Sequence, residues 1–438
     1  MLFLLVLFVS ALFGGQDFTA LDNLVESELK GSGAPGAVVA IVQGDRVAHL
    51  KAYGVANVET GEKMTTDTLF RIGSTTKIFT AAAVLSLVND GKLDLSKPIS
   101  TYVKGLDPAI GSITTHQLLS HTAGLGDRGS GNGSHDDAAL GLTMRALKSD
   151  MIELTPGEIF SYSSLGYWLA GFVLEEISGK PFADAVTERV FEPTGMKGST
   201  FRPLMAMTYP IAQQHEGGPE KTPKVIRPFA DEANSWPGGS AFASGRGLAN
   251  FMSAFLNSGL SAETIKRMSS PQAAFPGSPD THYGYGLVTS MDRGVRTVSH
   301  GGARIGFGSM LTMAPDQKVG VAVVVNRSNA MLGKVAQKAL EMTVKYGPDK
   351  AEAPPSSSGP AISDSAGTYV GGPIRVVLST KDEAAEVSMD GKTYPVKSLG
   401  EGRFLAQGPV GYFVLVPGPE GKTRYMHTNL RALRRLKP

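Results

Sequence analysis

The sequence of 438 residues contains no cysteine, which excludes disulfide bonds, thiol nucleophiles and thiolate metal ligands. Its eight histidines are scattered and form no pair of the H-E-x-x-H type, so no metal site is expected. Neither sign of charge is in excess, because 42 Lys and Arg residues face 40 Asp and Glu residues, a net charge of +2. The sequence therefore gives no reason to expect a nucleic-acid partner or binding to an anionic membrane surface.

The apolar stretch at the N-terminus is too short to span a membrane. Residues 1–16 carry no charge, but a membrane-spanning helix needs about 20 apolar residues. The stretch fits a secretory signal peptide, with Gly14 and Gly15 as small residues near a cleavage site, although the usual basic start is missing. We therefore expect an exported protein, periplasmic or secreted, with no membrane span after cleavage. An uncleaved anchor and a misassigned start are the alternatives.

The composition is that of an ordinary globular protein with a large core, at 42% hydrophobic and 19% charged residues, and the length favours two or three domains. A helix over 18–30 and two strands come first, helices and glycine-rich loops follow, and strands return after about residue 280. For residues 17–345 this order predicts one mixed sheet built from both chain ends, with a helical insertion between them. The expected strands are Gly36–Val42, Arg46–Gly54, Gly284–Thr289, Arg296–Ser299, Gly308–Ala314 and Val319–Val325, and a helix over Ala330–Lys345 closes the region.

Residues 346–363 are rich in proline, serine and alanine and predict an interdomain linker. After them, residues 364–438 consist of short β-type segments separated by turn residues. Asp390-Gly391 between two such segments is a strong hairpin signal. These features predict a small separate domain, an antiparallel barrel or sandwich, so that the whole chain belongs to the α+β class.

The segment RIGSTTKIFTAAAVLSLVNDG, residues 71–91, predicts a helix that is apolar on nearly every face and therefore buried. Its first turn nevertheless carries Ser74 and, three residues later on the same face, Lys77. Burial of an unpaired ammonium is costly and lowers its pKa, so the amine can take the Ser74 proton and create a nucleophile. The free N–H groups of the first turn can hold an oxyanion. The alternative is a lysine that extends from a packed helix into solvent.

Two further stretches point to chemistry only in combination with Ser74. Tyr162 lies in a turn before a helix, within PGEIFSYSSLGYWLAG, and a tyrosine there is usually a packing residue. In TVSHGGARIGFGS a strand ends at His300-Gly301-Gly302, where two glycines allow a ligand to approach the backbone. A lone histidine in such a place is usually a loop or core residue. Ser-x-x-Lys alone is equally weak, because a second copy, Ser27 to Lys30, ends a solvated helix.

Six segments in register resemble the serine β-lactamase and penicillin-binding-protein superfamily over about residues 34–345. They are PGAVVAIVQGDRVAHLKAYGVANVETG, TLFRIGSTTK, ITTHQLLSHTAGL, PGEIFSYSSLGYWLAG, YGYGL and HGGARIGFGS. The resemblance is to the class C-like branch, which includes family VIII carboxylesterases and D-amino-acid peptidases. It implies a β-lactamase/transpeptidase-like fold, an antiparallel sheet flanked by helices with an all-helical insertion. It also implies acyl transfer through a covalent acyl-serine, with no metal or organic cofactor. The implied substrate is a small ester, amide or β-lactam.

The resemblance also implies roles for individual residues. Ser74 is the nucleophile, Lys77 its general base or proton relay, and Tyr162 shares the proton transfer, with a phenolate favoured by nearby cations. The backbone N–H groups of Ser74 and Ala303 form the oxyanion hole. The substrate-binding positions are Ser164, His300, Gly301 and Gly302, and His121 braces a loop without a catalytic role.

Two departures from the family pattern bear on the substrate. Ser164 stands where many relatives have asparagine, and its short hydroxyl offers one donor to an acylamino side chain. His300 replaces the lysine of class C β-lactamases, and a mostly neutral imidazole holds a carboxylate less well. Both favour a carboxylesterase acting on small esters, with weak β-lactam or amide hydrolysis. A β-lactamase, D,D-peptidase or D-aminopeptidase acting on cell-wall-type substrates is one alternative, and a β-lactam sensor that is acylated without turnover is another.

Overall fold

The computed structural model describes residues 16–127, 133–218, 220–328, 330, 332–348, 360–381 and 384–436. Apart from Gln16, the expected signal peptide lies outside these ranges, as does most of the expected linker, so both stay predictions. Within the described ranges no helix is long and apolar enough to cross a membrane, and no cluster of His, Asp and Glu side chains is arranged to hold a metal ion.

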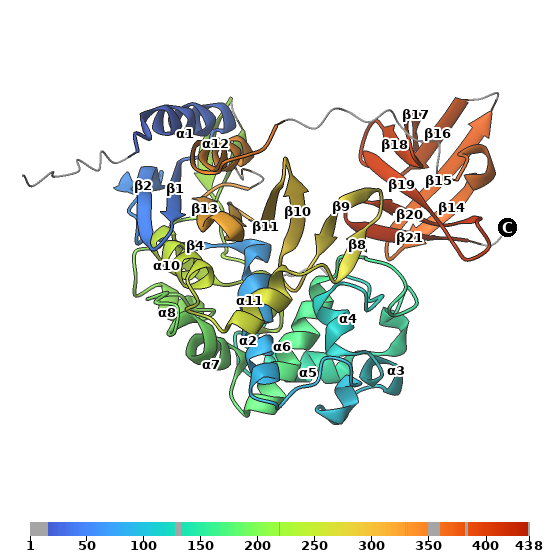
Figure 1. Ribbon diagram of the computed structural model, residues 1–438, viewed down its shortest axis with the longest axis horizontal. Coiled ribbons are helices and arrows are strands. Elements are labelled where there is room, and N and C mark those ends of the chain that lie inside the picture. Colours follow the sequence, from blue (N-terminus) through green and yellow to red (C-terminus); the bar gives the residue numbers. More distant parts are fainter. Residues whose placement is uncertain are drawn as a thin grey trace, which may run out of the picture.

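A nine-stranded antiparallel sheet joins the early and the late part of the chain (Figure 1). Strand β1 lies between β2 and β13, so that Val39 pairs with Lys51 on one side and with Val323 on the other. The prediction of one sheet built from both chain ends is therefore confirmed. In sheet order the strands are β3 (Glu62–Lys63), β2 (Arg46–Asn57), β1 (Gly36–Gln43), β13 (Val319–Val325), β12 (Phe307–Ala314), β11 (Val295–Arg304), β10 (Val288–Asp292), β9 (Ser278–Tyr283) and β8 (Ala273–Phe275).

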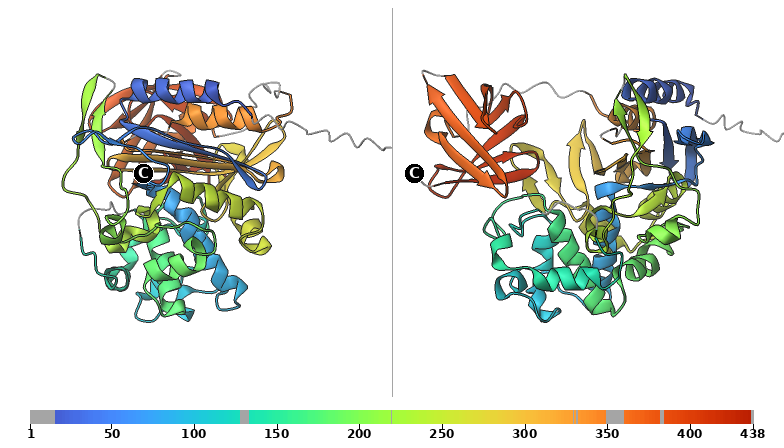
Figure 2. Two further views of the ribbon diagram at one scale, coloured as in Figure 1. Left: turned by 90° about the vertical axis from the view of Figure 1, so that its left-hand side faces the viewer. Right: turned by 180° about the vertical axis from the view of Figure 1, so that it is seen from behind.

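Both faces of this sheet are covered, which explains the continuous apolar runs of its central strands. Successive side chains of a strand point to opposite faces, and in β1 Val38 belongs to one hydrophobic core and Val39 to the other. Helices α1 (Thr19–Ser32) and α12 (Gly333–Thr343) cover one face, and the remaining helices lie on the other side (Figures 1 and 2).

The inserted region contains the buried helix expected over 71–91. It starts with a 3-10 turn, Gly73–Thr75, and continues as α2 (Thr76–Asn89), in which eleven of fourteen residues are buried. The prediction of an all-helical insertion is wrong in one respect, because four short strands pair within it as β4–β7 and β5–β6. The other elements of this region are α3 (Pro108–Gly111), α4 (Thr115–Leu119), α5 (Ala139–Ala146), α6 (Ser164–Ser178), α7 (Phe182–Val186), α8 (Pro203–Ala206), α9 (Trp236–Gly239), α10 (Gly245–Leu256), α11 (Ala262–Ser269), β4 (Leu69–Arg71), β5 (His215–Gly218), β6 (Lys221–Val225) and β7 (Phe242–Ser244).

The strand predicted over Gly284–Thr289 is wrong for its first four residues, 284–287. Strand β9 ends at Tyr283 and β10 begins only at Val288. The residues between them form a turn in which the Gly284 N–H donates to the Leu287 carbonyl at 2.7 Å. The glycines of this segment reverse the chain instead of extending it.

The C-terminal residues form a separate closed barrel of eight antiparallel strands (Figure 2). Asp390 and Gly391 have φ values of +51° and +74° and connect β16 to β17, as the Asp-Gly signal predicts. The α+β fold class with a small C-terminal β domain is confirmed, and the domain is a barrel. Its strands are β14 (Gly367–Gly371), β15 (Ile374–Lys381), β16 (Ala384–Met389), β17 (Lys392–Gly400), β18 (Arg403–Ala406), β19 (Tyr412–Pro417), β20 (Thr423–Thr428) and β21 (Arg431–Arg435).

The barrel is attached to the part of the first domain that leads into α6. Arg424 on β20 forms an ion pair with Glu158 at 2.6 Å. Beside it the two domains share a small apolar cluster of Leu154, Ile159, Tyr425 and Ala432. These contacts hold the barrel against the chain segment that ends at Tyr162.

Candidate active site

Ser74 lies in the 3-10 turn that leads into α2, beside strand β11. The preceding Gly73 has a φ of +52°, and a Cβ at this residue would lie 2.6 Å from the backbone nitrogen of Ala303. Only glycine fits so close an approach in this left-handed conformation. The residue before Ser74 is thus packed against Ala303, and the N–H groups of Ser74 and Ala303 are the two that the family resemblance assigns to an oxyanion hole.

Hydroxyl groups and a second glycine hold this turn against the sheet. Ser309 Oγ on β12 donates to the Ile72 carbonyl at 2.7 Å and lies 2.8 Å from Thr75 Oγ1. On β11, a Cβ at Gly302 would lie 2.0 Å from the Ile72 carbonyl oxygen, so the two backbones are in contact there. These contacts determine where Ser74 lies relative to β11.

The Lys77 side chain is fully buried at the start of α2. Its Nζ donates to the Gly238 carbonyl at 2.6 Å and lies 3.3 Å from both Ser74 Oγ and Ser164 Oγ. Burial lowers the pKa of Lys77 to about 7, although the negative charge of Asp127 opposes the shift. Much of this amine is therefore neutral near pH 7 and able to accept a proton.

Tyr162 lies just before α6, with its ring centroid 4.7 Å from Lys77 Nζ. The nearby Ser74 and Ser164 side chains and the charge of Arg431 favour ionisation of its phenol. Burial nevertheless raises the pKa of Tyr162 above its ordinary value. The phenolate implied by the family resemblance is therefore disfavoured, because desolvation outweighs these favourable neighbours.

His121 holds the segment that contains Tyr162. The Ser161 N–H donates to the His121 carbonyl at 2.8 Å, and the Ser163 N–H donates to His121 Nδ1 at 3.1 Å. Ser163 Oγ caps α6 by accepting a hydrogen bond from the Gly166 N–H at 3.2 Å. Burial lowers the pKa of His121 well below its ordinary value, so the imidazole is neutral. The expectation that His121 braces a loop is confirmed.

Both ring nitrogens of His300 are engaged within the protein. Nδ1 donates to the Gly301 carbonyl at 2.7 Å, which leaves Nε2 to accept a hydrogen bond from the Tyr283 hydroxyl at 3.1 Å. Burial lowers the pKa of His300 to about 3, so the imidazole is neutral. In this arrangement His300 offers no positive charge to a substrate carboxylate.

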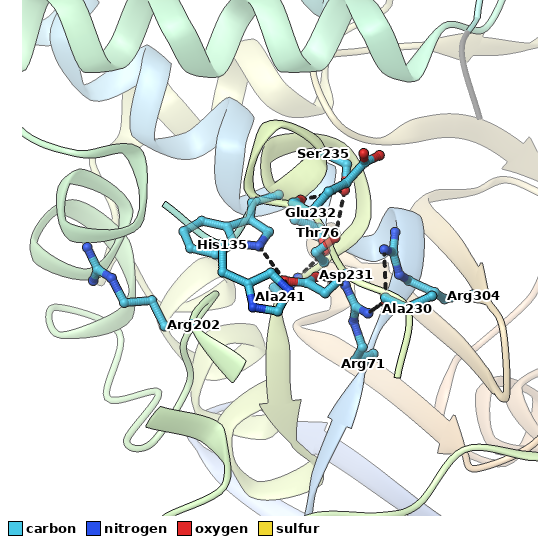
Figure 3. A network of polar contacts seen from close by, with 12 residues as sticks. Arg71, Thr76, His135, Arg202, Ala230, Asp231, Glu232, Ser235, Ala241 and Arg304 are labelled. Carbon is cyan, nitrogen blue, oxygen red and sulfur yellow. Dashed lines mark hydrogen bonds and ion pairs between the residues drawn. The ribbon is translucent and has the colours of Figure 1, made fainter. Parts of the chain in front are cut away.

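Arg71 and Asp231 form a buried ion pair (Figure 3). Asp231 is 1% exposed and accepts hydrogen bonds from the Arg71 guanidinium and, at 3.1 Å, from Trp236 Nε1. Trp236 begins α9, the short helix that contains the Gly238 carbonyl. The ion pair therefore holds the segment on which the Lys77 hydrogen bond depends.

The structure brings together Ser74, Lys77, Tyr162 and Ser164, and it places Ala303 and Gly302 beside the Ser74 turn. Gly301 and His300 lie on the same strand, with the imidazole turned toward Tyr283. The sequence assigned no role to five supporting residues: Asp127, Gly238, Tyr283, Ser309 and Arg431. The signal for Tyr283 and Ser309 was present, since both lie within the segments that carry the family resemblance.

Comparison with known proteins agrees with this geometry. A family model described as Beta-lactamase matches residues 21–341. The chain is 28% identical over 333 residues to Protein flp of Staphylococcus aureus (strain MW2), which covers 72% of this chain and 64% of that protein. The chain thus spans less than two thirds of the length of this relative. It is also 30% identical over 311 residues to Penicillin-binding protein 4 of Amycolatopsis lactamdurans, covering 67% of this chain and 81% of that protein.

Solved structures share the fold, in one case including the barrel. SurE with D-Leu matches with a TM-score of 0.74 and 25% identity, over 95% of this chain and 99% of that chain. The D-amino acid amidase of Ochrobactrum anthropi SV3, solved with L-phenylalanine amide, matches with a TM-score of 0.61 and 23% identity, over 74% of this chain and 98% of that chain. Because the family match covers most of the sequence and a curated relative is 30% identical, this chain belongs to the beta-lactamase family, whose members are typically hydrolases.

Proposed function

We propose that this chain is a serine hydrolase that forms a covalent acyl-enzyme on Ser74, and that small carboxylic esters are its preferred substrates. The observation that carries the proposal is the buried Lys77 amine, which lies 3.3 Å from Ser74 Oγ and has a pKa lowered to about 7. A buried lysine of depressed pKa beside a hydroxyl is suited to activating a weak nucleophile. The family acts on small esters, amides and β-lactams, so the substrate is expected to belong to one of these classes.

In the proposed acylation, the neutral Lys77 amine takes the Ser74 proton as Oγ bonds to the ester carbonyl carbon. The carbonyl π electrons move to oxygen, and the backbone N–H groups of Ser74 and Ala303 bind the oxyanion. When the intermediate collapses, the bond to the alkoxide breaks and the alkoxide takes a proton from the Tyr162 phenol. The Lys77 ammonium then returns a proton to Tyr162. The raised pKa of Tyr162 suits a donor, because it keeps the phenol protonated at neutral pH.

In the proposed deacylation, a water molecule attacks the acyl carbonyl carbon and gives a proton to the Lys77–Tyr162 pair. The bond between the acyl carbon and Ser74 Oγ then breaks, Ser74 regains a proton, and the carboxylic acid leaves. One ester and one water are thus converted into one acid and one alcohol.

Two features of the site support esters as the preferred substrates. The Ser164 hydroxyl, 3.3 Å from Lys77 Nζ, offers one donor where a carboxamide offers two. The neutral His300, with both ring nitrogens engaged, provides no cation for the carboxylate of a β-lactam. A small neutral ester needs neither interaction.

A second candidate function is hydrolysis of an amide bond next to a D-amino acid. Two structural relatives support it, because SurE is solved with D-Leu and the Ochrobactrum anthropi enzyme is a D-amino acid amidase. Cell-wall-type substrates, including D,D-peptides and β-lactams, belong to the same alternative.

Intact-protein mass spectrometry after rapid mixing tests these functions. The full chain is mixed separately with p-nitrophenyl acetate, benzylpenicillin and D-phenylalanine amide, and samples are quenched over time. We expect an acetyl adduct that peptide mapping assigns to Ser74 and that disappears while p-nitrophenol is released. The amide and the penicillin are expected to react more slowly than the ester.

The other outcomes separate the remaining functions. Faster release of ammonia from D-phenylalanine amide than of p-nitrophenol from the ester would favour the second candidate. A stable penicilloyl adduct without turnover of any of the three compounds would favour a sensor. Absence of an adduct on Ser74 with all three compounds, and of any turnover, would show that the proposed function is wrong.

The rate of Ser74 acylation is expected to rise with pH through about pH 7. Lys77 acts as the neutral amine. With a pKa of about 7, about a tenth of Lys77 is neutral one pH unit below that pKa, and about nine tenths is neutral one pH unit above it. Titration of His121 and His300 does not contribute to this rise of the rate with pH, because burial holds the pKa of both well below 7. Stopped-flow measurement of the p-nitrophenol burst from roughly pH 5 to 9 checks this, and a flat profile would contradict it.

A further inference from the structure

The hairpin between β20 and β21 of the barrel reaches the segment that contains Tyr162. The Tyr162 N–H donates to the Leu430 carbonyl at 2.8 Å, and the Ala432 N–H donates to Ser161 Oγ at 3.2 Å. Leu430 has a φ of +65°, an unfavourable conformation for a side chain of this size outside a turn that imposes it. This conformation of the hairpin tip directs the Leu430 carbonyl to the N–H of Tyr162.

The first residue of β21 continues this contact with a charge. Arg431 forms an ion pair with Asp127 Oδ2 at 2.5 Å, and Asp127 Oδ1 accepts a hydrogen bond from the Ser164 N–H at 3.0 Å. The Asp127 carboxylate therefore bridges the barrel and the N-terminus of α6, where an anion is favoured by the helix dipole. The Asp127 side chain is 13% exposed, so solvent screens its charge only weakly.

Asp127 is the charged residue that lies between the barrel and the candidate active site. Its negative charge raises the pKa of both Lys77 and Tyr162, while the positive charge of Arg431 lowers the pKa of Tyr162. The half-buried Glu153 also faces this ion pair. The titratable groups that face Lys77 are the Tyr162 and Tyr167 rings, His121, His300 and Asp127.

We propose that Arg431 of the barrel is a positioning residue for the Ser74–Lys77–Tyr162 site, because it holds Asp127 against the start of α6 and offsets the negative charge that Asp127 presents to Lys77. This inference rests on the proposed function of Ser74 as nucleophile. With this role of Arg431 the barrel is a part of the active site. Contacts that only attach one domain to the other would not give it such a role. The barrel then contributes to the rate of acylation without contacting the reacting atoms.

Loss of the Arg431 charge has a predictable effect on Lys77. The Asp127 carboxylate would act unopposed, so the ammonium form of Lys77 would be stabilised and less neutral amine would be present at a given pH. We therefore expect Arg431→Gln to shift the acidic limb of the acylation profile upward by about one pH unit and to lower the rate at about pH 6 roughly tenfold. In Asp127→Asn/Arg431→Gln the limb should return to the wild-type position or below it, because the unopposed charge is gone.

The matched control is Arg424→Gln, since Arg424 forms the other ion pair across the same domain interface, with Glu158 at 2.6 Å. This variant should leave the pH profile of acylation unchanged. Arg431→Lys, which keeps the positive charge, should retain a profile close to that of the wild type. Thermal unfolding of all variants shows whether each is folded, and Arg431→Lys keeps the test decisive if Arg431→Gln does not fold.

The readout is the pre-steady-state burst of p-nitrophenol from p-nitrophenyl acetate, measured on the full chain, with the Ser74 adduct confirmed by peptide mapping. Absence of an adduct in the wild type would overturn the proposed function and this inference with it. A wild type that is acylated, combined with an Arg431→Gln profile that coincides with it, would overturn the inference alone. Equal losses in Arg431→Gln and Arg424→Gln would also overturn it, because docking of the barrel rather than the charge on Asp127 would then be responsible.

Discussion

Replacement of Lys77 by methionine is expected to lower kcat for ester hydrolysis by about 10²–10⁴-fold, and kcat/KM by the same factor. Methionine has a similar length and suits a buried position, but its thioether takes no proton from Ser74. KM should change little, because the Lys77 amine contacts Ser74, Ser164 and Gly238 within the protein. Steady-state rates with p-nitrophenyl acetate measure the loss.

Two further variants separate the loss of a base from the loss of a charge. Lys77→Arg keeps the positive charge but is not deprotonated, so it should be as slow as Lys77→Met if the residue acts as a base. Ser74→Ala/Lys77→Met should be no slower than Ser74→Ala, because residues that act as a unit are not additive. If Lys77→Arg retained more than about a tenth of the wild-type kcat, a role as general base would be untenable.

Replacement of Asp231 by asparagine is expected to lower the free energy of unfolding of the first domain by about 3–5 kcal/mol. Arg71 is 1% exposed, and the change leaves its guanidinium buried without a counter-charge (Figure 3). Asparagine keeps the shape of the side chain and an oxygen that can accept from Trp236 Nε1. Urea-induced unfolding followed by tryptophan fluorescence measures the effect, because the two tryptophans, Trp168 and Trp236, both lie outside the barrel.

The matched control is Asp316→Asn, which removes one partner of the exposed Arg296–Asp316 ion pair. Exposed pairs contribute little, so this change should cost less than about 1 kcal/mol. Arg71→Met/Asp231→Asn should regain part of the stability, since the uncompensated charge is no longer buried. The explanation fails if Asp231→Asn and Asp316→Asn unfold at the same urea concentration.

Much of the fold was predictable because the relevant signals are local. The apolar run over Val319–Val325 predicts a buried strand, and β13 has these bounds. The local pattern does not decide the structure of the segment Gly284–Thr289, because a short apolar run with glycines fits both a strand and a turn. In the folded chain this segment is the turn between β9 and β10, closed by the hydrogen bond from the Gly284 N–H to the Leu287 carbonyl.

The supporting residues of the candidate site were predictable to different degrees. Tyr283 and Ser309 lie in segments that resemble the family, so their neighbourhood was visible in the sequence. Asp127 and Arg431 carry no such signal, because they are separated by 304 positions and belong to different domains. An isolated aspartate in a loop and an arginine near the end of a β domain are ordinary surface residues until the fold brings them together.

By itself, the sequence determined that Ser74 and Lys77 share one face of one buried helix, because a spacing of three residues is a local property of helical geometry. It also determined the central strands of the sheet, β1, β12 and β13 among them, and the Asp390-Gly391 turn of the barrel. Only the tertiary structure decided how deeply Lys77 is buried, that both nitrogens of His300 are engaged, and that a barrel arginine faces Asp127. The reason is that a pKa and a hydrogen-bond partner depend on which groups exclude water and which charges approach in space, and neither is specified by neighbours along the chain.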